Sequence, residues 1–178
     1  MSVDVLFVGL GNPGSAHARQ RHNAGFMAIK GIAEAFSFSP LMLKGNAYLS
    51  HKHIHEKDVL LCLPNTYMNL SGEAVTPLMR FYKIPLKNVV VFCDELDIPL
   101  GDVRWKEGGG HNGHNGLRSI SAHCGTEYGR IRIGIGRPVS EKRDISSYVL
   151  GAFSTSEKPI LDHALEKALH MAEDFLTK

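Results

Sequence analysis

Short apolar runs alternate along the chain with longer amphipathic stretches, and glycine-rich turns separate them. The apolar runs are rich in Val, Ile, Leu or Phe, which predicts β-strands over residues 3–9, 47–53, 58–63, 88–93, 102–106 and 130–136. The polar segment from Lys52 to Lys57 predicts a β-hairpin, so the sheet is expected to be mixed rather than purely parallel.

Four amphipathic stretches predict helices, because their apolar residues recur at helical spacing. They cover about residues 23–36 and 71–82, a segment that begins near Asn115, and a C-terminal segment with Pro159 in its first turn. The C-terminal stripe is the clearest and consists of Leu161, Leu165, Ala168, Ala172 and Phe175. Alternating strands and helices favour an α/β fold. Without a repeat or a long linker, the 178 residues predict a single domain, 1–178.

Composition places the chain among ordinary soluble proteins. Its 43% hydrophobic content is typical of a globular domain, and no stretch reaches the ~18 to 20 continuous apolar residues that span a membrane. The first apolar run contains Asp4 and lacks a basic lead-in, which predicts a buried strand rather than a signal peptide. Three unclustered cysteines, Cys62, Cys93 and Cys124, indicate reduced thiols, so the expected location is cytoplasmic.

The overall charge says little about partners, because the formal net charge is only +2. Basic residues nevertheless gather in three places, which a solvated surface would also explain. The three groups are Arg19 with Arg21, Arg104 with Lys106, and a larger set of Arg130, Arg132, Arg137, Lys142 and Arg143.

The first predicted strand leads into GLGNPG at residues 9–14, which matches the dinucleotide-binding pattern G-x-G-x-x-G. In a dinucleotide-binding fold the third glycine of this pattern lies in a helix, and an acidic residue about 20 positions later binds the ribose. Here Pro13 interrupts the turn and Glu34 lies within the first predicted helix, which disfavours dinucleotide binding. The alternative is a different ligand site outside the strand end, to which Asn12 contributes a side-chain amide.

His22 is the candidate general base. It stands before the first predicted helix, whose dipole disfavours a protonated imidazole, and Asn23 is placed to cap that helix. A lone histidine is usually structural or solvated, so this one needs a partner. Asp94 follows the apolar run 88–93, where a carboxylate can fix the imidazole tautomer and raise its pKa again. Such opposed effects leave a base poised near neutral pH.

Two polar loops follow other predicted strands. The first, PNTYMNLSG at 64–72, carries amides, hydroxyls and a Met–aromatic pair, although turn chemistry alone would also explain it. The second, GGGHNGHNGL at 108–117, has two histidines and two asparagines. Its glycines let the backbone fold tightly against another segment.

The sequence disfavours both a catalytic metal and a serine or cysteine nucleophile. His51, His53 and His55 alternate along one strand, and His111 and His114 are three apart, but no well-placed carboxylate or cysteine completes either set in the sequence. A serine esterase would need a G-x-S-x-G elbow, which is missing from the sequence. The cysteines are interpreted as inert thiols.

In combination, GLGNPG, RHNAGF, NTYMNLSG, DELDIPLG, GGGHNGHNGL and RIRIGIGRP resemble the motifs of the bacterial-type peptidyl-tRNA hydrolase family over nearly the whole chain. The resemblance implies a twisted mixed β-sheet flanked by helices, in a three-layer αβα arrangement of the phosphorylase/hydrolase-like kind. It also implies a monomer that needs no cofactor or metal. The implied reaction is hydrolysis of the ester between a nascent peptide and the 3′ ribose of tRNA.

The resemblance also assigns residue roles, motif by motif. His22 resembles the catalytic base, and Asp94 resembles the carboxylate that orients it. The implied substrate-binding residues are Asn12, Tyr67, Met68, Asn69, His114 and Asn115. Among these, His114 is expected to help close its loop over the cleft. The implied tRNA-binding residues are Arg104, Lys106 and Arg132.

Two positions depart from the family pattern. His17 stands where relatives commonly have tyrosine, and Asn112 replaces a usual glycine in the GGGH loop. Asparagine tolerates a left-handed backbone better than most residues, so Asn112 is compatible with such a turn. Two rival hypotheses stay open: a non-catalytic RNA-binding relative on the same fold, and a nicotinamide-dependent oxidoreductase.

Overall fold

The central feature of the computed structural model, which describes residues 2–140 and 144–178, is one β-sheet. Within these residues, seven strands lie in the order β2-β3-β4-β1-β5-β7-β6. Their bounds are β1 Val5–Gly9, β2 Met42–Lys44, β3 Ala47–Ile54, β4 Lys57–Pro64, β5 Val89–Glu95, β6 Val103–Glu107 and β7 Gly129–Gly134. Strands β4, β1, β5 and β7 run parallel, whereas β2, β3 and β6 pair in antiparallel fashion. The predicted mixed sheet is confirmed.

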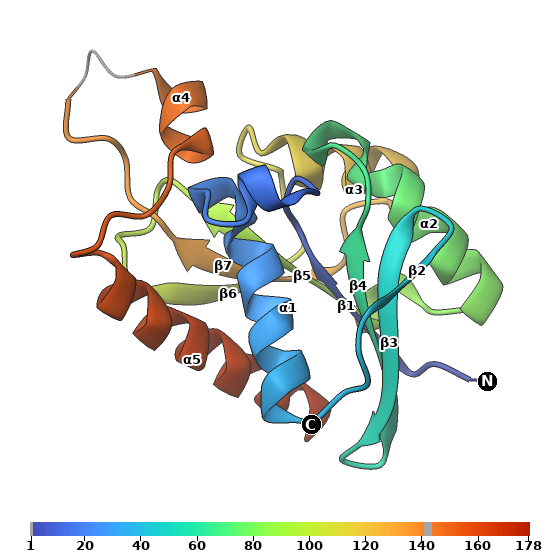
Figure 1. Cartoon of the computed structure of the whole chain (residues 1–178). Helices are drawn as coiled ribbons and strands as arrows, with labels where there is room; N and C mark the ends of the chain where they lie inside the picture. The colour runs from blue at the N-terminus through green and yellow to red at the C-terminus, as the bar shows by residue number, and fades with distance from the viewer. Residues whose placement is uncertain (1, 141–143) are drawn as a thin grey trace.

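Helices cover both faces of the sheet (Figure 1). Helices α1 (Ala24–Ala35) and α5 (Lys158–Leu176) pack on one face, and α2 (Ser71–Tyr82) and α3 (Asn115–Cys124) pack on the other. The predicted three-layer α/β domain is therefore confirmed. The short helix α4 (Ile145–Leu150) lies beyond the sheet, at the top of Figure 1. Among the described helices, none is both long and apolar enough to cross a membrane.

Side chains of the central strands point alternately to the two faces of the sheet, which explains why a hydrophobic core lies on each face. In β1, Val5 and Phe7 belong to the cluster packed under α1 and α5, whereas Leu6 and Val8 belong to the cluster under α2 and α3. Successive strand residues point to opposite faces of a sheet. A strand covered on both faces therefore reads as one continuous apolar run, as this one does.

Two glycines let α1 approach the sheet closely. A Cβ atom at Gly25 would lie 2.2 Å from the carbonyl oxygen of Phe92, and a Cβ atom at Gly9 would lie 2.4 Å from the carbonyl oxygen of Gly25. Only glycine fits such close backbone contacts. The segment just before α1, which contains His22, is thereby held beside the ends of β1 and β5.

The hairpin predicted around residues 52–57 is confirmed between β3 and β4. His55 and Glu56 at its turn both have left-handed backbone angles, with φ of 50° and 65°, as two-residue hairpin turns require. Two short elements, β2 and α4, were not predicted. Lys142 and Arg143 of the predicted basic group lie outside the described residues.

Candidate functional site

Three neighbouring parallel strands bring their carboxyl ends to one edge of the sheet, where open α/β sheets usually bind ligands. Asn12 follows β1, the 3₁₀ turn Met68–Leu70 follows β4, and β5 ends with Asp94 and Glu95. The 3₁₀ turn Arg21–Asn23 and the first residues of α3 lie at the same end of the molecule (Figure 1). The fold therefore collects motifs that are far apart in the sequence.

His22 and Asp94 are in direct contact. The Nδ1 atom of His22 lies 2.9 Å from each carboxylate oxygen of Asp94, and the two side chains are 12% and 3% exposed. A carboxylate only accepts hydrogen bonds, so this partner assigns the imidazole proton to Nδ1. The lone pair of Nε2 is then free to take up a proton.

A second histidine shares the same carboxylate. His114 donates from Nε2 to Oδ1 of Asp94 at 2.8 Å. Its Nδ1 accepts hydrogen bonds from the backbone N–H groups of Gly116 and Leu117, and so caps α3. The imidazole rings of His22 and His114 are 4.8 Å apart. The sequence predicted only a role of His114 in loop closure. The structure adds a direct contact of His114 with Asp94.

Burial and charge shift the pKa values of His22 and Asp94 in opposite directions. Desolvation lowers the pKa of His22, but the charge and hydrogen bond of Asp94 raise it, and the net shift is upward from 6.5. Desolvation also opposes ionisation of Asp94, yet His22 and His114 together hold the pKa of its carboxyl far below the usual range. Asp94 is therefore a permanent carboxylate at neutral pH, as an orienting residue must be.

A pocket of about 130 Å³ lies beside His22 and Asp94. Three of its lining residues, Ile145, Ser146 and Val149, come from α4, which sequence reasoning missed. Signals for this helix were present: Asp144 caps it by accepting a hydrogen bond from the Ser146 N–H at 3.3 Å, and apolar residues recur at helical spacing. The rest of the wall consists of Glu95, Leu96, Asn112, Gly113, His114 and Asn115.

Asn12 is fixed by two partners. The side chain of Asn23 accepts from the Asn12 N–H and donates to the Asn12 carbonyl, both at 2.9 Å. The side-chain oxygen of Asn12 accepts from the Met68 N–H at 2.8 Å. Asn23 therefore fixes this turn, and the prediction that its side chain caps α1 is wrong. The amide nitrogen of Asn12 has no hydrogen-bond partner within residues 2–140 and 144–178.

The other predicted substrate residues lie around the start of α3. Met68 is buried, and its sulfur packs against Gly116, where a Cβ atom would be only 2.7 Å away. Tyr67 is 68% exposed, and Asn69 and Asn115 are also exposed. Of the predicted substrate residues, the pocket beside His22 contains Asn115 and His114, but it does not include the Tyr67–Asn69 segment or Asn12.

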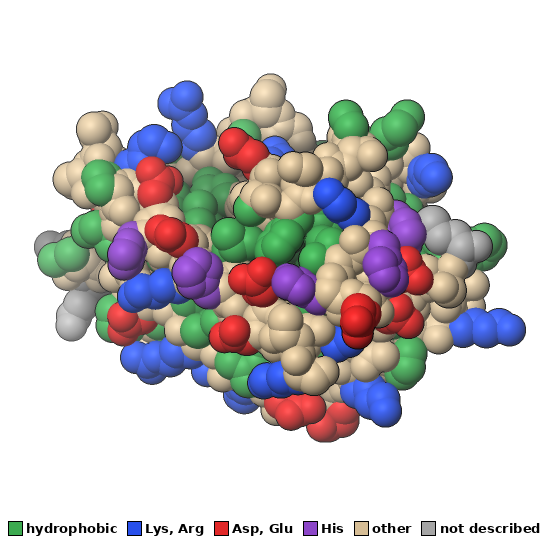
Figure 2. Space-filling model, turned by 90° about the horizontal axis from the view of Figure 1, so that it is seen from below, with side chains coloured by type: hydrophobic (Ala, Val, Ile, Leu, Met, Phe, Trp, Pro, Cys, Tyr) green, Lys and Arg blue, Asp and Glu red, His purple; other side chains and the backbone are tan. Residues whose placement is uncertain are grey.

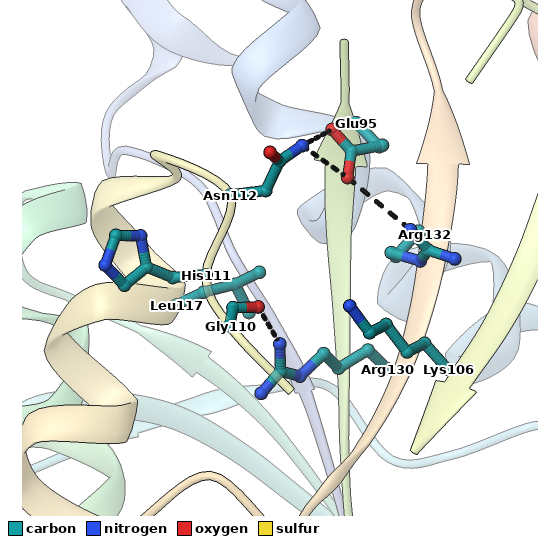
Figure 3. Close-up of a pocket in the computed structure, with 8 residues that line it drawn as sticks. All are labelled: Glu95, Lys106, Gly110, His111, Asn112, Leu117, Arg130 and Arg132. Atoms are coloured by element: carbon teal, nitrogen blue, oxygen red, sulfur yellow. Dashed lines mark hydrogen bonds and ion pairs between the residues drawn. The ribbon is translucent and has the colours of Figure 1, made fainter. Parts of the chain in front are cut away.

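The predicted tRNA-binding residues lie on β6 and β7. Arg104 pairs with Arg132 in the antiparallel register, and Lys106 pairs with Arg130, so four cations share one face. Lys106, Arg130 and Arg132 line a second pocket of about 220 Å³, together with Glu95 (Figure 3). Arg104 lies outside this pocket and forms an exposed ion pair with Asp102 at 3.6 Å.

Arg130 differs from the other cations because it is only 1% exposed. Its guanidinium donates to the carbonyl oxygens of Gly109, Gly110 and Thr126, and it stacks 4.5 Å from the centre of the Tyr128 ring. It thereby holds the glycine-rich loop against β7. The sequence grouped Arg130 with exposed cations and carried no signal of this burial.

Several histidines have acidic partners that the sequence did not reveal. His51 and His53 approach Asp58 at 3.4 and 3.1 Å, and His55 pairs with Glu173 at 3.0 Å. Carboxylates therefore lie beside this trio, but within the described residues the trio does not form a group with the spacing of metal ligands. Figure 2 shows the end of the molecule opposite the strand-end site, where histidines lie among interspersed acidic and basic side chains.

The described residues contain one group with the spacing of metal ligands, formed by His22, Asp94 and His114, whose ligand atoms lie within 4.8 Å of one another. Ligand atoms of a tetrahedral zinc site are about 3.3 Å apart, from zinc bond lengths near 2.0–2.2 Å. The N···O separations of 2.8 and 2.9 Å are instead those of charge-assisted hydrogen bonds. The geometry therefore favours a hydrogen-bonded cluster.

In this structure, a histidine bound to a carboxylate lies beside a pocket at the strand ends of an α/β sheet. Such an arrangement is typical of an enzyme that uses acid–base chemistry. Comparison with known proteins narrows this class, because the family model for peptidyl-tRNA hydrolase matches residues 6–178. The chain belongs to the peptidyl-tRNA hydrolase family, and the predicted enzyme class is confirmed.

Individual relatives agree with this family. A peptidyl-tRNA hydrolase from Bartonella henselae is 53% identical over 161 residues, which cover 90% of this chain and 83% of that protein. One from Xanthobacter autotrophicus is 47% identical over 168 residues, with coverage of 94% and 83%. The crystal structure of peptidyl-tRNA hydrolase from Acinetobacter baumannii has a TM-score of 0.91 and 42% identity, over 99% of this chain and 90% of that one.

Proposed function

We propose that this protein hydrolyses the ester between a peptide and the 3′ ribose of tRNA, with His22 as the general base and Asp94 as the residue that orients it. The observation that carries the proposal is the contact of the His22 Nδ1 atom with Asp94 at 2.9 Å beside a pocket. It leaves Nε2 as a proton acceptor. General-base catalysis of this kind typically contributes about 10²- to 10⁴-fold in rate.

In the proposed reaction, Nε2 of His22 removes a proton from water while the water oxygen attacks the ester carbonyl carbon. The tetrahedral intermediate then expels the ribose 3′ oxygen, which takes the proton back from the imidazolium. Asp94 stabilises that imidazolium and keeps Nδ1 protonated throughout. No covalent intermediate, cofactor or metal enters these steps.

We assign the developing oxyanion to the amide nitrogen of Asn12 or a neighbouring backbone N–H. The contact between the Asn12 oxygen and the Met68 N–H at 2.8 Å supports this, because it orients the amide and leaves its nitrogen as the donor. Asn69 and Asn115 are the proposed ligands of the peptide backbone and the water, and Tyr67 and Met68 shape the cleft. His114 is proposed to align Asp94 and to help close the loop over the cleft.

We further propose that Lys106 and Arg132, with Arg104 on the same face, bind tRNA phosphates. The guanidinium of Arg132 makes no hydrogen bond to another described residue, and its Nε atom is buried without a partner. Lys106 likewise has no ion pair within the described residues. A buried donor without a partner, such as Nε of Arg132, is costly, and a phosphate oxygen would satisfy it. We expect the protein to act as a cytoplasmic monomer.

The direct test is release of peptide from N-blocked aminoacyl-tRNA by the purified protein. Multiple turnover is expected. Binding of tRNA without turnover would contradict the proposal and favour the non-catalytic RNA-binding hypothesis. For the tRNA contacts, Lys106→Ala is expected to raise KM for peptidyl-tRNA about threefold to tenfold, with a smaller effect on a minimal aminoacyl-adenosine ester. Lys87→Ala, an exposed lysine outside the basic pocket, is the matched control.

A further inference from the structure

Asn112 lies at a left-handed turn of the glycine-rich loop, and its side chain contacts two carboxylates. Its φ of 49° lies in the left-handed region, which asparagine tolerates better than most residues other than glycine. The amide nitrogen donates to Glu95 at 3.1 and 3.3 Å and to Asp97 at 2.7 Å. These contacts tie the glycine-rich loop to the end of β5 and to the turn after it. An exposed amide with contacts to two carboxylates calls for an explanation.

Glu95 lies between Asn112 and Arg132 (Figure 3). Its carboxylate is 3.7 Å from NH1 of Arg132, whereas arginine–carboxylate pairs usually close to about 2.7–2.9 Å. The shorter contacts of Glu95 go to the Asn112 amide. The guanidinium of Arg132 is left without a hydrogen bond to any described residue, and its Nε atom is buried. The carboxylate therefore stays loosely paired with the cation although the two are neighbours.

Glu95 and Asn112 also line both pockets, the one beside His22 and the basic one that contains Arg132. The pair thus stands where the proposed ester site and the proposed phosphate site meet. The position of the Glu95 carboxylate decides how much positive charge the basic pocket offers, because opposite charges in a partly buried site attract strongly.

We propose that Asn112 holds Glu95 away from Arg132 and so keeps the guanidinium available for a phosphate of bound tRNA. The proposal rests on the tRNA-binding role assigned to Arg132 above. Without the Asn112 amide, the Glu95 carboxylate closes onto Arg132 and neutralises it. Asn112 is then a specificity-determining residue: it acts on recognition of the tRNA part of the substrate rather than on the ester.

The test variant is Asn112→Gly, because glycine adopts a φ of 49° without strain and only the amide is lost. The expected result is binding of deacylated tRNA weakened about threefold to tenfold, with the slope of log Kd against log salt reduced by about 0.7–0.9, one phosphate contact. Adding Glu95→Gln to Asn112→Gly is expected to restore both quantities, because a neutral side chain cannot neutralise Arg132. Ser37→Gly, also exposed and with φ of 54°, is the matched control.

Arg132→Gln separates this proposal from the one on which it rests. If Arg132→Gln changes neither the affinity nor the salt slope, the assigned tRNA contact is wrong. If Arg132→Gln weakens binding but Asn112→Gly does not, or if Glu95→Gln fails to rescue, the role of Asn112 is wrong. The loss of kcat/KM in Asn112→Gly should also be larger for peptidyl-tRNA than for a minimal aminoacyl-adenosine ester. Equal losses on both substrates would show that Asn112 acts through the His114 loop, which overturns the proposal.

Discussion

Two clusters in this molecule have the same composition, two histidines around one aspartate, but they lie in different surroundings. In the strand-end cluster the side chains are 3–12% exposed, and in the hairpin cluster they are 27–63% exposed. The strand-end cluster consists of His22, His114 and Asp94, and the hairpin cluster consists of His51, His53 and Asp58.

The difference shows what converts such residues into a site. In the hairpin cluster, the pKa of Asp58 is lowered mainly by its hydrogen bond to His53, yet solvent screens the exposed pair. In the strand-end cluster, a helix cap fixes the tautomer of His114, and Asp94 fixes that of His22. A lowered pKa is common to both aspartates, so burial, fixed tautomers and an adjacent pocket distinguish the strand-end cluster.

The largest expected effect comes from removing one imidazole in each cluster. His22→Ala should reduce kcat/KM for peptidyl-tRNA by about 10²- to 10⁴-fold, because the general base is lost. His53→Ala should change it less than twofold. Single-turnover release of labelled peptide measures both variants, and circular dichroism checks that each is folded. Wild-type turnover by His22→Ala would show that the base has been wrongly assigned.

Replacing the shared carboxylates should have a smaller effect. Asp94→Asn is expected to lower kcat/KM about tenfold to a hundredfold, because a hydrogen bond to a charged group contributes about 1.5–3 kcal/mol and each 1.36 kcal/mol is tenfold in rate. This is less than the loss in His22→Ala, because the imidazole itself remains. Asp58→Asn serves as the matched control in the same assay. Equal losses in the two asparagine variants would mean that the buried pair has no special role.

The pH profile sharpens the comparison further. Activity requires neutral His22, whose pKa is raised in the folded protein, so kcat/KM should fall as pH drops through that raised pKa. The stability contribution of His22 has the opposite sign: it is complete below pH ~6.5 and is lost as pH rises through the raised pKa. In Asp94→Asn the acid limb should move to lower pH, because the attraction that raised the pKa is gone. In Asp58→Asn the acid limb should stay at the same pH. An equal shift of the limb in this variant would contradict the assignment of His22 and Asp94 as the pair that sets the pH profile.

Much of the fold follows from the sequence because buried strands and long helices leave strong patterns. The core strands are continuous apolar runs, and the stripe of α5 buries Leu161, Ala168 and Ala172 as predicted. Strand β2 has three exposed residues and therefore no apolar pattern. Helix α4 has six residues, so its cap and its apolar spacing extend over less than two turns and are a weak signal. Such short elements are defined by tertiary contacts rather than by local pattern.

The site was predictable only in part. The sequence paired His22 with Asp94, a pairing that the structure contains. The sharing of Asp94 by His114 and the burial of Arg130 depend on contacts between segments distant in the sequence. Local propensities carry no information on such contacts. The α4 wall of the pocket was missed for a different reason: Asp144 marked the start of that helix, but six residues give only a weak local pattern.

The smallest expected effect is that of a chelator, which tests whether either cluster works through a metal. Incubation with EDTA should change kcat/KM less than twofold, because the 2.8 and 2.9 Å separations around Asp94 are hydrogen-bond distances and already satisfy both imidazole N–H groups. A zinc ion at Nδ1 of His22 would displace that proton to Nε2, which would then lack the lone pair needed to activate water. Metal binding to this cluster should therefore inhibit rather than support hydrolysis. Loss of activity in EDTA followed by recovery on adding Zn²⁺ would replace the hydrogen-bonded interpretation with a metal centre.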